Sequence, residues 1–174
     1  GGLIAEPVAR LGAAVTGVDP AEKNIDVARQ HAEGQGLDLA YEAATVEDLV
    51  AANRHFDVVL CLEVVEHVPD PAAFLRLCAA LVRPGGLLIA STINRTMKSF
   101  LLAIVGAEYV LRWLPVGTHR WERFITPDEL AGHLTSAGLA GVRSEGMVYN
   151  LLADTWSLSV DTDVNYLAAA AKPI

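Results

Sequence analysis

The sequence predicts an α/β fold built around a mainly parallel sheet. Between residues 3 and 92, short runs of β-forming apolar residues alternate with segments whose apolar residues recur at helical spacing. Such alternation is typical of parallel βαβ units with right-handed crossovers. The chain has 174 residues, of which 52% are hydrophobic and 20% charged, so it has the size and composition of one globular domain. We therefore expect a single domain over residues 1–174.

The predicted helices combine helical apolar spacing with residues that favour helix ends. Asp70 and Pro71 form a strong start, because aspartate is a good N-cap and proline fits the first helical position. Thr126 and Glu129 form a second, since they can complete a capping box around Pro127. We expect helices at residues 3–11, 22–31, 46–52, 71–82 and 127–138.

The predicted strands are short runs of β-forming residues. Residues 56–62 are a nearly unbroken apolar run, which suits a central strand covered on both faces. The last two strands are expected to include an antiparallel, hairpin-like pair at one edge of the sheet. We expect strands at residues 13–18, 37–41, 56–62, 87–92, 142–149 and 165–171.

A long apolar helical stretch at residues 98–113 interrupts the alternation of strands and helices. We interpret residues 98–121 as an inserted lid. Apolar bulk flanked by cations and aromatic residues suits contact with a lipid interface or with an apolar substrate tail. A buried core helix is the alternative that this composition equally allows. The three tryptophans are interpreted as pocket or core anchors: Trp113, Trp121 and Trp156.

The composition excludes several classes of protein. The formal net charge is -8 and no basic run is present, which argues against a nucleic-acid partner. No uncharged apolar stretch reaches the ~18 residues that would span a bilayer. Cys61 and Cys78 each lie in an apolar stretch, so we expect buried free thiols in a reducing compartment. These observations predict a cytoplasmic protein.

The beginning of the chain has the order of a nucleotide-binding unit. Gly1 and Gly2 precede a helix, a strand and then Asp19, which follows that strand directly. A glycine turn lets backbone N–H groups approach a ligand, and an acid at the strand end can accept both hydroxyls of a ribose. Ordinary turn glycines and an Asp19 that only caps the next helix are the alternatives. The chain opens abruptly in a helical pattern, so we expect a truncated N-terminus.

A second group of polar residues follows the predicted strand 56–62. Glu63, Glu66 and His67 lie at its carboxyl end, where open α/β sheets bind ligands. Their i, i+3, i+4 spacing predicts one face of a helical turn. Two carboxylates and an imidazole could bind a divalent cation, or His67 could act as a general base. Solvated turn residues before the next helix are the structural alternative.

Several sequence blocks resemble one enzyme family. The main blocks are Val15-Thr16-Gly17-Val18-Asp19-Pro20, Phe56-Asp57-Val58-Val59, Glu63-Val64-Val65-Glu66-His67-Val68, Pro84-Gly85-Gly86, and Ser91-Thr92-Ile93-Asn94-Arg95-Thr96 with Lys98-Ser99. Further blocks are Ala107-Glu108-Tyr109-Val110-Leu111, Gly117-Thr118-His119 and Asp163-Val164-Asn165-Tyr166. Along essentially its whole length the chain resembles the ubiquinone-biosynthesis O-methyltransferases.

The resemblance implies a Rossmann-like class I fold that depends on S-adenosylmethionine as cofactor. The sheet would be mainly parallel with an antiparallel last strand, and the helical insertion would follow its fifth strand. The first strand, with its Gly-Cys-Gly turn, would be missing just before Gly1. By the same resemblance Gly1 and Asp19 would bind the cofactor, with Asp19 at the ribose, and Leu62 would lie by its adenine or sulfonium.

The resemblance also implies a site for chemistry and a substrate. Glu63, Glu66 and His67 match positions linked in some relatives to a divalent metal, for which Mg²⁺ is the candidate, and Glu63 and His67 are the expected catalytic residues. The implied reaction methylates a catechol oxygen of a polyprenylated ring at two steps, on 2-polyprenyl-6-hydroxyphenol and on 3-demethylubiquinol. Peripheral contact with the inner membrane through residues 98–121, and a ubiquinone-biosynthesis complex, are the implied associations.

Two other functions remain open from the sequence. Another small-molecule methyltransferase acting on a carboxylate or an amine would share the cofactor half of the fold, because that half does not determine the acceptor. A cofactor-free binding partner in a quinone-biosynthesis assembly is the alternative that is not an enzyme. Binding of S-adenosylmethionine would separate these two.

Overall fold

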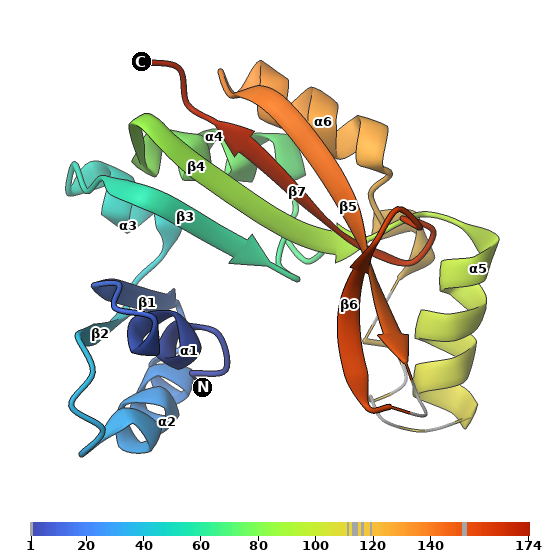
Figure 1. Ribbon diagram of the computed structural model, residues 1–174, viewed down its shortest axis with the longest axis horizontal. Coiled ribbons are helices and arrows are strands. Elements are labelled where there is room, and N and C mark those ends of the chain that lie inside the picture. Colours follow the sequence, from blue (N-terminus) through green and yellow to red (C-terminus); the bar gives the residue numbers. More distant parts are fainter. Residues whose placement is uncertain (1, 111, 113–114, 116, 119, 151–152) are drawn as a thin grey trace. The chain divides into compact units, whose positions relative to one another are not determined.

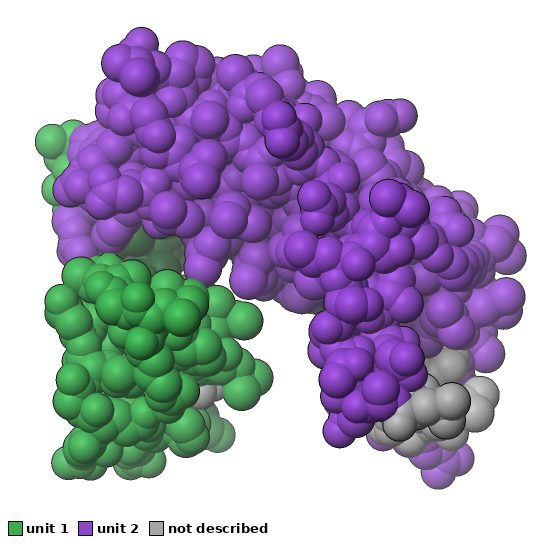
Figure 2. Space-filling model, in the orientation of Figure 1, with its two compact units in different colours: residues 1–53 green, residues 54–174 purple. Residues whose placement is uncertain are grey.

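A computed structural model describes residues 2–110, 112, 115, 117–118, 120–150 and 153–174, without the side chains of residues 106–108 and 110. The chain forms two compact units, residues 1–53 and residues 54–174, drawn in green and purple in Figure 2. The prediction of one domain over residues 1–174 stays a prediction.

Unit 1 consists of a parallel two-stranded sheet and three helices. β1 (Val15–Asp19) pairs with β2 (Leu39–Ala43) in parallel along their whole lengths. The predicted helices and strands of this part are confirmed to within two residues at each end. The helices are α1 (Ala5–Arg10), α2 (Glu22–Ala32) and α3 (Val46–Ala51).

Glu6 joins α1 to α2 within unit 1. Its side chain is 2% exposed, and its Oε1 lies 2.6 Å from His31 Nδ1. Its Oε2 accepts hydrogen bonds from Arg10 Nη2 and Gln35 Nε2, each at 3.1 Å. The contact with His31, above all, holds the pKa of Glu6 below its usual value, although burial acts in the opposite direction. A buried carboxylate therefore connects the first two helices.

Unit 2 contains a five-stranded mixed sheet in the order β3-β4-β7-β5-β6 (Figure 1). β3 and β4 pair in parallel, whereas β4–β7, β7–β5 and β5–β6 are antiparallel. The antiparallel β7 lies between β4 and β5 rather than at the edge, which the sequence did not predict. The strands are β3 (Phe56–Leu62), β4 (Val82–Ile93), β5 (Ala140–Asn150), β6 (Thr155–Ser159) and β7 (Asn165–Ala171).

Two helices, α4 (Pro71–Leu81) and α6 (Pro127–Ser136), pack against each other and against this sheet. Both begin as predicted: Asp70 accepts a hydrogen bond from Ala73 N–H, and Thr126 completes a capping box with Glu129. Alternate residues of β7 are buried, as expected when one face of the sheet is covered, whereas the last four residues of β4 are all buried. The core of unit 2 includes Leu75, Cys78, Leu88, Leu130, Leu134, Tyr166 and Ala168.

β3 was predicted to be a central strand, but it is an end strand of the five-stranded sheet of unit 2. In unit 2, β3 pairs with β4 and forms one end of the strand order. Val58 and Leu60 are exposed in this strand, whereas Cys61 is buried against α4, and the hydrogen bond with Cys78 and burial raise the pKa of its thiol. Both cysteines are free and buried, which confirms that prediction.

The predicted helical insertion is confirmed over the part of it that the structure describes. α5 (Met97–Ser99) continues directly into η1 (Phe100–Val110), an 11-residue π-helix. This is much longer than the single-turn π-bulges that are usual in proteins. A capping box starts the helix, because Thr96 Oγ1 accepts from Ser99 N–H at 3.0 Å and Thr96 N–H donates to Ser99 Oγ at 3.2 Å. Trp113, near the predicted end of the helix, lies outside the described residues.

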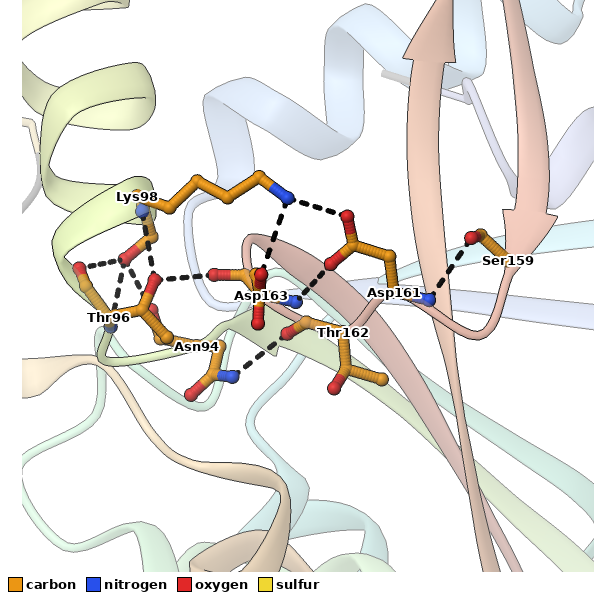
Figure 3. A network of polar contacts seen from close by, with 8 residues as sticks. Asn94, Thr96, Lys98, Ser159, Asp161, Thr162 and Asp163 are labelled. Atoms are coloured by element: carbon orange, nitrogen blue, oxygen red, sulfur yellow. Dashed lines mark hydrogen bonds and ion pairs between the residues drawn. The ribbon is translucent and has the colours of Figure 1, made fainter.

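Polar contacts attach the beginning of this insertion to the β6–β7 loop (Figure 3). Asn94 Nδ2 donates to the Thr162 carbonyl at 2.9 Å, and Thr96 Oγ1 donates to the Asp163 carbonyl at 2.6 Å. Lys98 Nζ lies 2.5 Å from Asp161 Oδ2 and 3.4 Å from Asp163 Oδ2. The base of α5 is therefore joined to the loop between the last two strands.

β6 was not among the strands predicted from the sequence. Its residues are mostly exposed, and it pairs in the described chain only with β5, so it lacks the apolar signal of a buried strand. Trp156 on this strand is 62% exposed and lies against Tyr149 with ring centroids 5.2 Å apart, so the prediction of a buried anchor is wrong for Trp156. Trp121 is half-buried and donates from Nε1 to the Thr96 carbonyl at 3.1 Å.

Candidate functional site

The candidate site in unit 2 begins where β3 ends. Leu62 is the last residue of β3, and Glu63 follows it with a φ of 54°, a left-handed conformation that non-glycine residues rarely adopt. Backbone conformations of this kind tend to occur at functional sites, where the surrounding structure maintains them. The left-handed backbone of Glu63 is therefore a structural feature of the candidate site.

Ser91 on β4 stabilises this conformation of Glu63. The Glu63 backbone N–H donates to the Ser91 carbonyl at 3.1 Å and to Ser91 Oγ at 3.0 Å. In turn, the Ser91 hydroxyl donates to Glu63 Oε1 at 2.6 Å. The next residue, Thr92, donates from Oγ1 to Glu66 Oε2 at 2.9 Å. Two adjacent hydroxyl residues of β4 thus position the two glutamates.

The expected helical face of Glu63, Glu66 and His67 is wrong. A single turn, closed by His67 N–H donating to the Val64 carbonyl at 2.9 Å, connects β3 to the segment before α4. Glu63 is exposed, whereas Glu66 is only 3% exposed. Because Glu63 has a left-handed backbone, residues 63–67 do not form a regular helix. Helical spacing therefore does not place the three side chains on one face.

Glu66 and His67 line a cavity of about 170 Å³. Glu66 Oε1 is buried and has no hydrogen-bond partner among the residues that the structure describes, so it can accept a further hydrogen bond. Glu63 is not part of the lining. The residues that line the cavity are Glu66, His67, Gly117, Thr118, Arg120, Arg123 and Phe124.

The opposite part of this lining comes from the segment after the insertion. Arg120 precedes the short 3₁₀ helix η2 (Trp121–Arg123), and Arg123 N–H donates to the Arg120 carbonyl at 2.8 Å. Ile125 N–H donates to the Ile93 carbonyl at 3.1 Å, which attaches the segment to the carboxyl end of β4. Neither Arg120 nor Arg123 was among the site residues predicted from the sequence. No local pattern marks either one as a neighbour of Glu66.

A metal site is not formed by the residues as they are placed. Among the residues that the structure describes, no group of three or more His, Cys, Asp or Glu side chains could hold a metal ion. The free Oε1 of Glu66 would suit a cation, but Glu66 Oε2 and Glu63 Oε1 accept hydrogen bonds from hydroxyl groups, and two arginines line the same cavity. The hydroxyl groups and arginines around the two glutamates do not fit a divalent cation. The assignment of Glu63, Glu66 and His67 as metal ligands stays a prediction.

The negative charge of the two glutamates reaches the core beside them. Tyr166 is buried, and its hydroxyl donates to the Ile125 carbonyl at 2.9 Å. Burial raises the pKa of Tyr166, and the nearby carboxylates, Glu66 and Glu63 among them, raise it further. Tyr166 therefore acts as a neutral hydrogen-bond donor that fixes the segment carrying Arg123.

The predicted cofactor residues Asp19 and Gly1 belong to unit 1. Asp19 ends β1, where its Oδ1 accepts from Ala21 N–H at 2.8 Å and its Oδ2 from Asn24 Nδ2 at 3.0 Å. The carboxylate thus supports the start of α2, and each oxygen retains capacity for a further hydrogen bond. Gly1 lies outside the described residues. The cofactor roles of Gly1, Asp19 and Leu62 stay predictions.

Gly2 does require its lack of a side chain. Its φ is 87°, and a Cβ there would lie 2.3 Å from Glu6 Oε1 and 2.9 Å from the Tyr41 hydroxyl. That hydroxyl is buried and has no hydrogen-bond partner in the part of the chain that the structure describes, and burial raises its pKa. A glycine turn before α1 beside an unpaired polar group fits a unit that binds a polar ligand part.

Comparison with known proteins gives the same fold class. Residues 1–90 match the methyltransferase domain family. The structure resembles magnesium protoporphyrin IX methyltransferase from Synechocystis PCC 6803 with bound SAH, with a TM-score of 0.70 and 21% identity over 97% of this chain and 68% of that one. It also resembles a possible histamine N-methyltransferase from Thermotoga maritima, with a TM-score of 0.65 and 19% identity over 95% of this chain and 75% of that one. The predicted class I methyltransferase fold is confirmed.

Sequence relatives define the family more narrowly. The chain is 57% identical to the ubiquinone biosynthesis O-methyltransferase of Methylobacterium nodulans over 174 residues, which cover 100% of this chain and 70% of the relative. It is 58% identical to the enzyme of the same name from Dinoroseobacter shibae, over 99% of this chain and 70% of that protein. The chain belongs to the ubiquinone biosynthesis O-methyltransferases, a family of S-adenosylmethionine-dependent methyltransferases.

Proposed function

We propose that this chain transfers the methyl group of S-adenosylmethionine to a catechol hydroxyl of polyprenylated ubiquinone precursors. Two such acceptors are proposed, 2-polyprenyl-6-hydroxyphenol and 3-demethylubiquinol. The observation that carries the proposal is 57% identity over the whole chain to a ubiquinone biosynthesis O-methyltransferase. The polar, ring-sized cavity beside Glu66 supports it, because a catechol presents two adjacent hydroxyls to polar groups.

The residues of unit 1 fit the nucleoside part of the cofactor. Asp19 offers carboxylate oxygens at the carboxyl end of β1, where a ribose can donate both of its hydroxyls. Gly1 is proposed to belong to the backbone turn before α1, with Gly2 beside it. Leu62 ends β3 and is proposed to contact the adenine or the sulfonium side.

For this reaction the protein has two main tasks: to align the acceptor oxygen with the methyl group and to help form the phenolate. The sulfonium of S-adenosylmethionine supplies an already activated methyl group, and the acceptor oxygen must approach it in line. His67 lines the cavity and is proposed to accept the phenolic proton, since histidine is the side chain that most often acts as a general base. Glu63 is proposed as the second catalytic residue, and its carboxylate accepts a hydrogen bond from the Ser91 hydroxyl.

We also propose that the insertion contacts lipid. Leu101, Leu102 and Tyr109 on η1 are each more than half exposed, which is unfavourable in water and suits an apolar environment. None of the helices in the described part of the chain is long and apolar enough to cross a bilayer. A peripheral position at the inner membrane, where polyprenylated substrates partition, is therefore the proposed location, and a complex with other enzymes of the pathway is a further proposal.

The decisive experiment is methyl transfer by the full chain from labelled S-adenosylmethionine to a short-chain prenylated catechol. We expect a single O-methyl ether, identified by mass spectrometry, and a slower reaction with the catechol that lacks the prenyl tail. Methylation of a carboxylate or an amine acceptor with none on the catechol would instead support another small-molecule methyltransferase. Calorimetry that detects no binding of S-adenosylmethionine or S-adenosylhomocysteine would support a cofactor-free binding partner.

A further inference from the structure

We propose that the cavity beside Glu66 binds the catechol ring as its monoanion, with Arg120 and Arg123 binding the ionised oxygen and Glu66 Oε1 accepting the hydrogen of the neighbouring hydroxyl. This inference rests on the proposed function and specifies which ionisation state of the acceptor ring the site recognises. It assigns the positive charge at the site to two guanidinium groups rather than to a divalent cation.

The size of the cavity suits one aromatic ring. Its volume is about 170 Å³, and cavities of about 150 Å³ are known to hold benzene. Phe124, which is only 1% exposed, belongs to the lining, and the rest of the lining is mainly polar. The cavity therefore fits a hydroxylated ring, and a polyprenyl tail would have to extend beyond it.

The charges of the lining favour an anion. Arg120 and Arg123 contribute two positive charges and Glu66 one negative charge, so the lining has an excess of one positive charge when His67 is neutral. In the part of the chain that the structure describes, no carboxylate forms an ion pair with either arginine. Guanidinium groups donate strong hydrogen bonds to anionic oxygens. An acceptor with a single negative charge would balance this lining.

Glu66 supplies the second point of recognition. Its Oε2 already accepts from Thr92 Oγ1 at 2.9 Å, so the carboxylate has a fixed orientation. Its Oε1 is buried, has no partner within the described part of the chain, and belongs to a residue of the cavity lining. A buried acceptor without a partner is costly, and a ligand hydroxyl would remove that cost. A catechol monoanion offers one hydroxyl donor beside one ionised oxygen, which matches both halves of the lining.

The test measures ring binding without cofactor and without methyl transfer. The probes are 4-nitrocatechol and 4-nitrophenol, both of which are anionic at mildly alkaline pH and change absorbance when bound. Only 4-nitrocatechol has the neighbouring hydroxyl that Glu66 is proposed to recognise. Binding to the full chain is measured by absorbance titration and calorimetry in the presence of a chelator, with Arg123→Gln, Arg120→Gln and Glu66→Gln as variants. Arg76→Gln removes the same charge from an exposed site on α4 outside the cavity and is the matched control.

The arginine variants and the glutamate variant should give different patterns. We expect Arg123→Gln and Arg120→Gln to weaken the binding of both probes by about tenfold, because each removes a charged hydrogen-bond donor. Glu66→Gln should weaken 4-nitrocatechol more than 4-nitrophenol. Arg76→Gln should change neither affinity by more than about twofold, as is usual for a remote exposed charge. Circular dichroism of each variant would verify that the fold is retained.

Two results would overturn the inference. One is binding of 4-nitrocatechol that needs added Mg²⁺ and disappears with the chelator, since a divalent cation would then supply the positive charge. The other is unchanged affinity in both folded arginine variants. Failure of the proposed function has a different outcome, because a chain that binds both probes as expected but methylates no prenylated catechol would keep the ring site and lose the assigned reaction.

Discussion

Thr92 Oγ1 on β4 donates a 2.9 Å hydrogen bond to Glu66 Oε2, and both side chains are buried. With this bond formed, Oε1 is the one oxygen of the Glu66 carboxylate that has no partner among the residues described by the structure. The orientation of the proposed acceptor group therefore depends on a strand residue that is not itself part of the cavity lining. Thr92 is a positioning residue in this arrangement.

Replacing Thr92 by Val should show this dependence. The substitution preserves the shape of the side chain but removes the donor, which leaves a buried carboxylate with a second unpaired oxygen. We expect the free energy of unfolding to fall by about 1–3 kcal/mol, the usual cost of an unsatisfied buried polar group. The affinity for 4-nitrocatechol should fall more than that for 4-nitrophenol. Thr92→Ser retains the hydroxyl and should restore the ratio of the two affinities; a Ser variant as selective as Val would argue against the positioning role.

The elements that the sequence predicted well are those with local signals. Asp70 and Thr126 begin α4 and α6 as expected because a cap depends on residues only three positions apart. β6 was missed because neither of its faces is well buried. Its pairing with β5 is the main contact that defines it. Alternating burial, on which strand prediction relies, is absent there.

The place of Glu66 and His67 in the fold was predicted from the sequence, whereas the conformation of their turn was not. Glu66 and His67 lie at the carboxyl end of β3, as open α/β sheets require. The left-handed backbone of Glu63 could not be anticipated, because glutamate has no preference for positive φ and the conformation depends on Ser91. Arg123 reaches the same cavity from a segment far along the chain, which no local spacing can reveal.

Gly146 on β5 should tolerate no side chain. A Cβ at this position would lie 1.7 Å from the Asp161 carbonyl oxygen, and backbone cannot move away as a flexible side chain can. We expect Gly146→Ala to lower the free energy of unfolding by about 1–3 kcal/mol, as overpacking usually does. The displaced loop should also weaken the contact between Lys98 and Asp161, which hydrogen exchange at α5 would detect.

Gly132→Ala provides the opposite result for the same chemical change. Gly132 lies within α6, and a Cβ there would meet no atom within 4 Å. Alanine in a helix interior is favoured over glycine by about 0.5–1 kcal/mol, so this variant should be stabilised. Thermal unfolding of both variants would decide the matter, and equal effects of the two substitutions would contradict the proposed clash at Gly146.

The stability of unit 1 should depend on acid pH through Glu6. The pKa of Glu6 is lowered in the folded chain, chiefly by its contact with His31. Its contribution is therefore fully present above the ordinary value of 4.5 and is lost as the pH falls through the lower folded-state value. The difference in melting temperature between the natural chain and Glu6→Gln should be largest near neutral pH and should close in acid.

Hydrogen exchange can locate this effect within the molecule. Below the ordinary pKa of Glu6, the amides of α1 and α2 should lose protection before those of α6, which belongs to unit 2. The α6 amides thus serve as an internal control in the same sample. Simultaneous loss of protection in both units would show that acid unfolding has another origin.

The exposed leucines of η1 are expected to contact lipid. Leu101 and Leu102 on η1 are each 55% exposed, and burying a leucine side chain in an apolar environment is worth about 1.5–3 kcal/mol. Replacing both by Gln should therefore reduce the partitioning of the chain into phospholipid vesicles by tenfold or more. Phe100 is half-buried and Trp113 lies outside the described residues, so neither is as clean a target.

The matched control for this prediction removes two exposed apolar residues from unit 1. Leu3 and Val27 are 86% and 51% exposed, so replacing both by Gln lowers the apolar surface by a similar amount outside η1. Flotation with vesicles should separate the two double variants, since only the η1 variant is expected to stay in the unbound fraction. If both variants float like the natural chain, η1 is not the lipid contact; if both fail to float, the effect reflects overall hydrophobicity and not this helix.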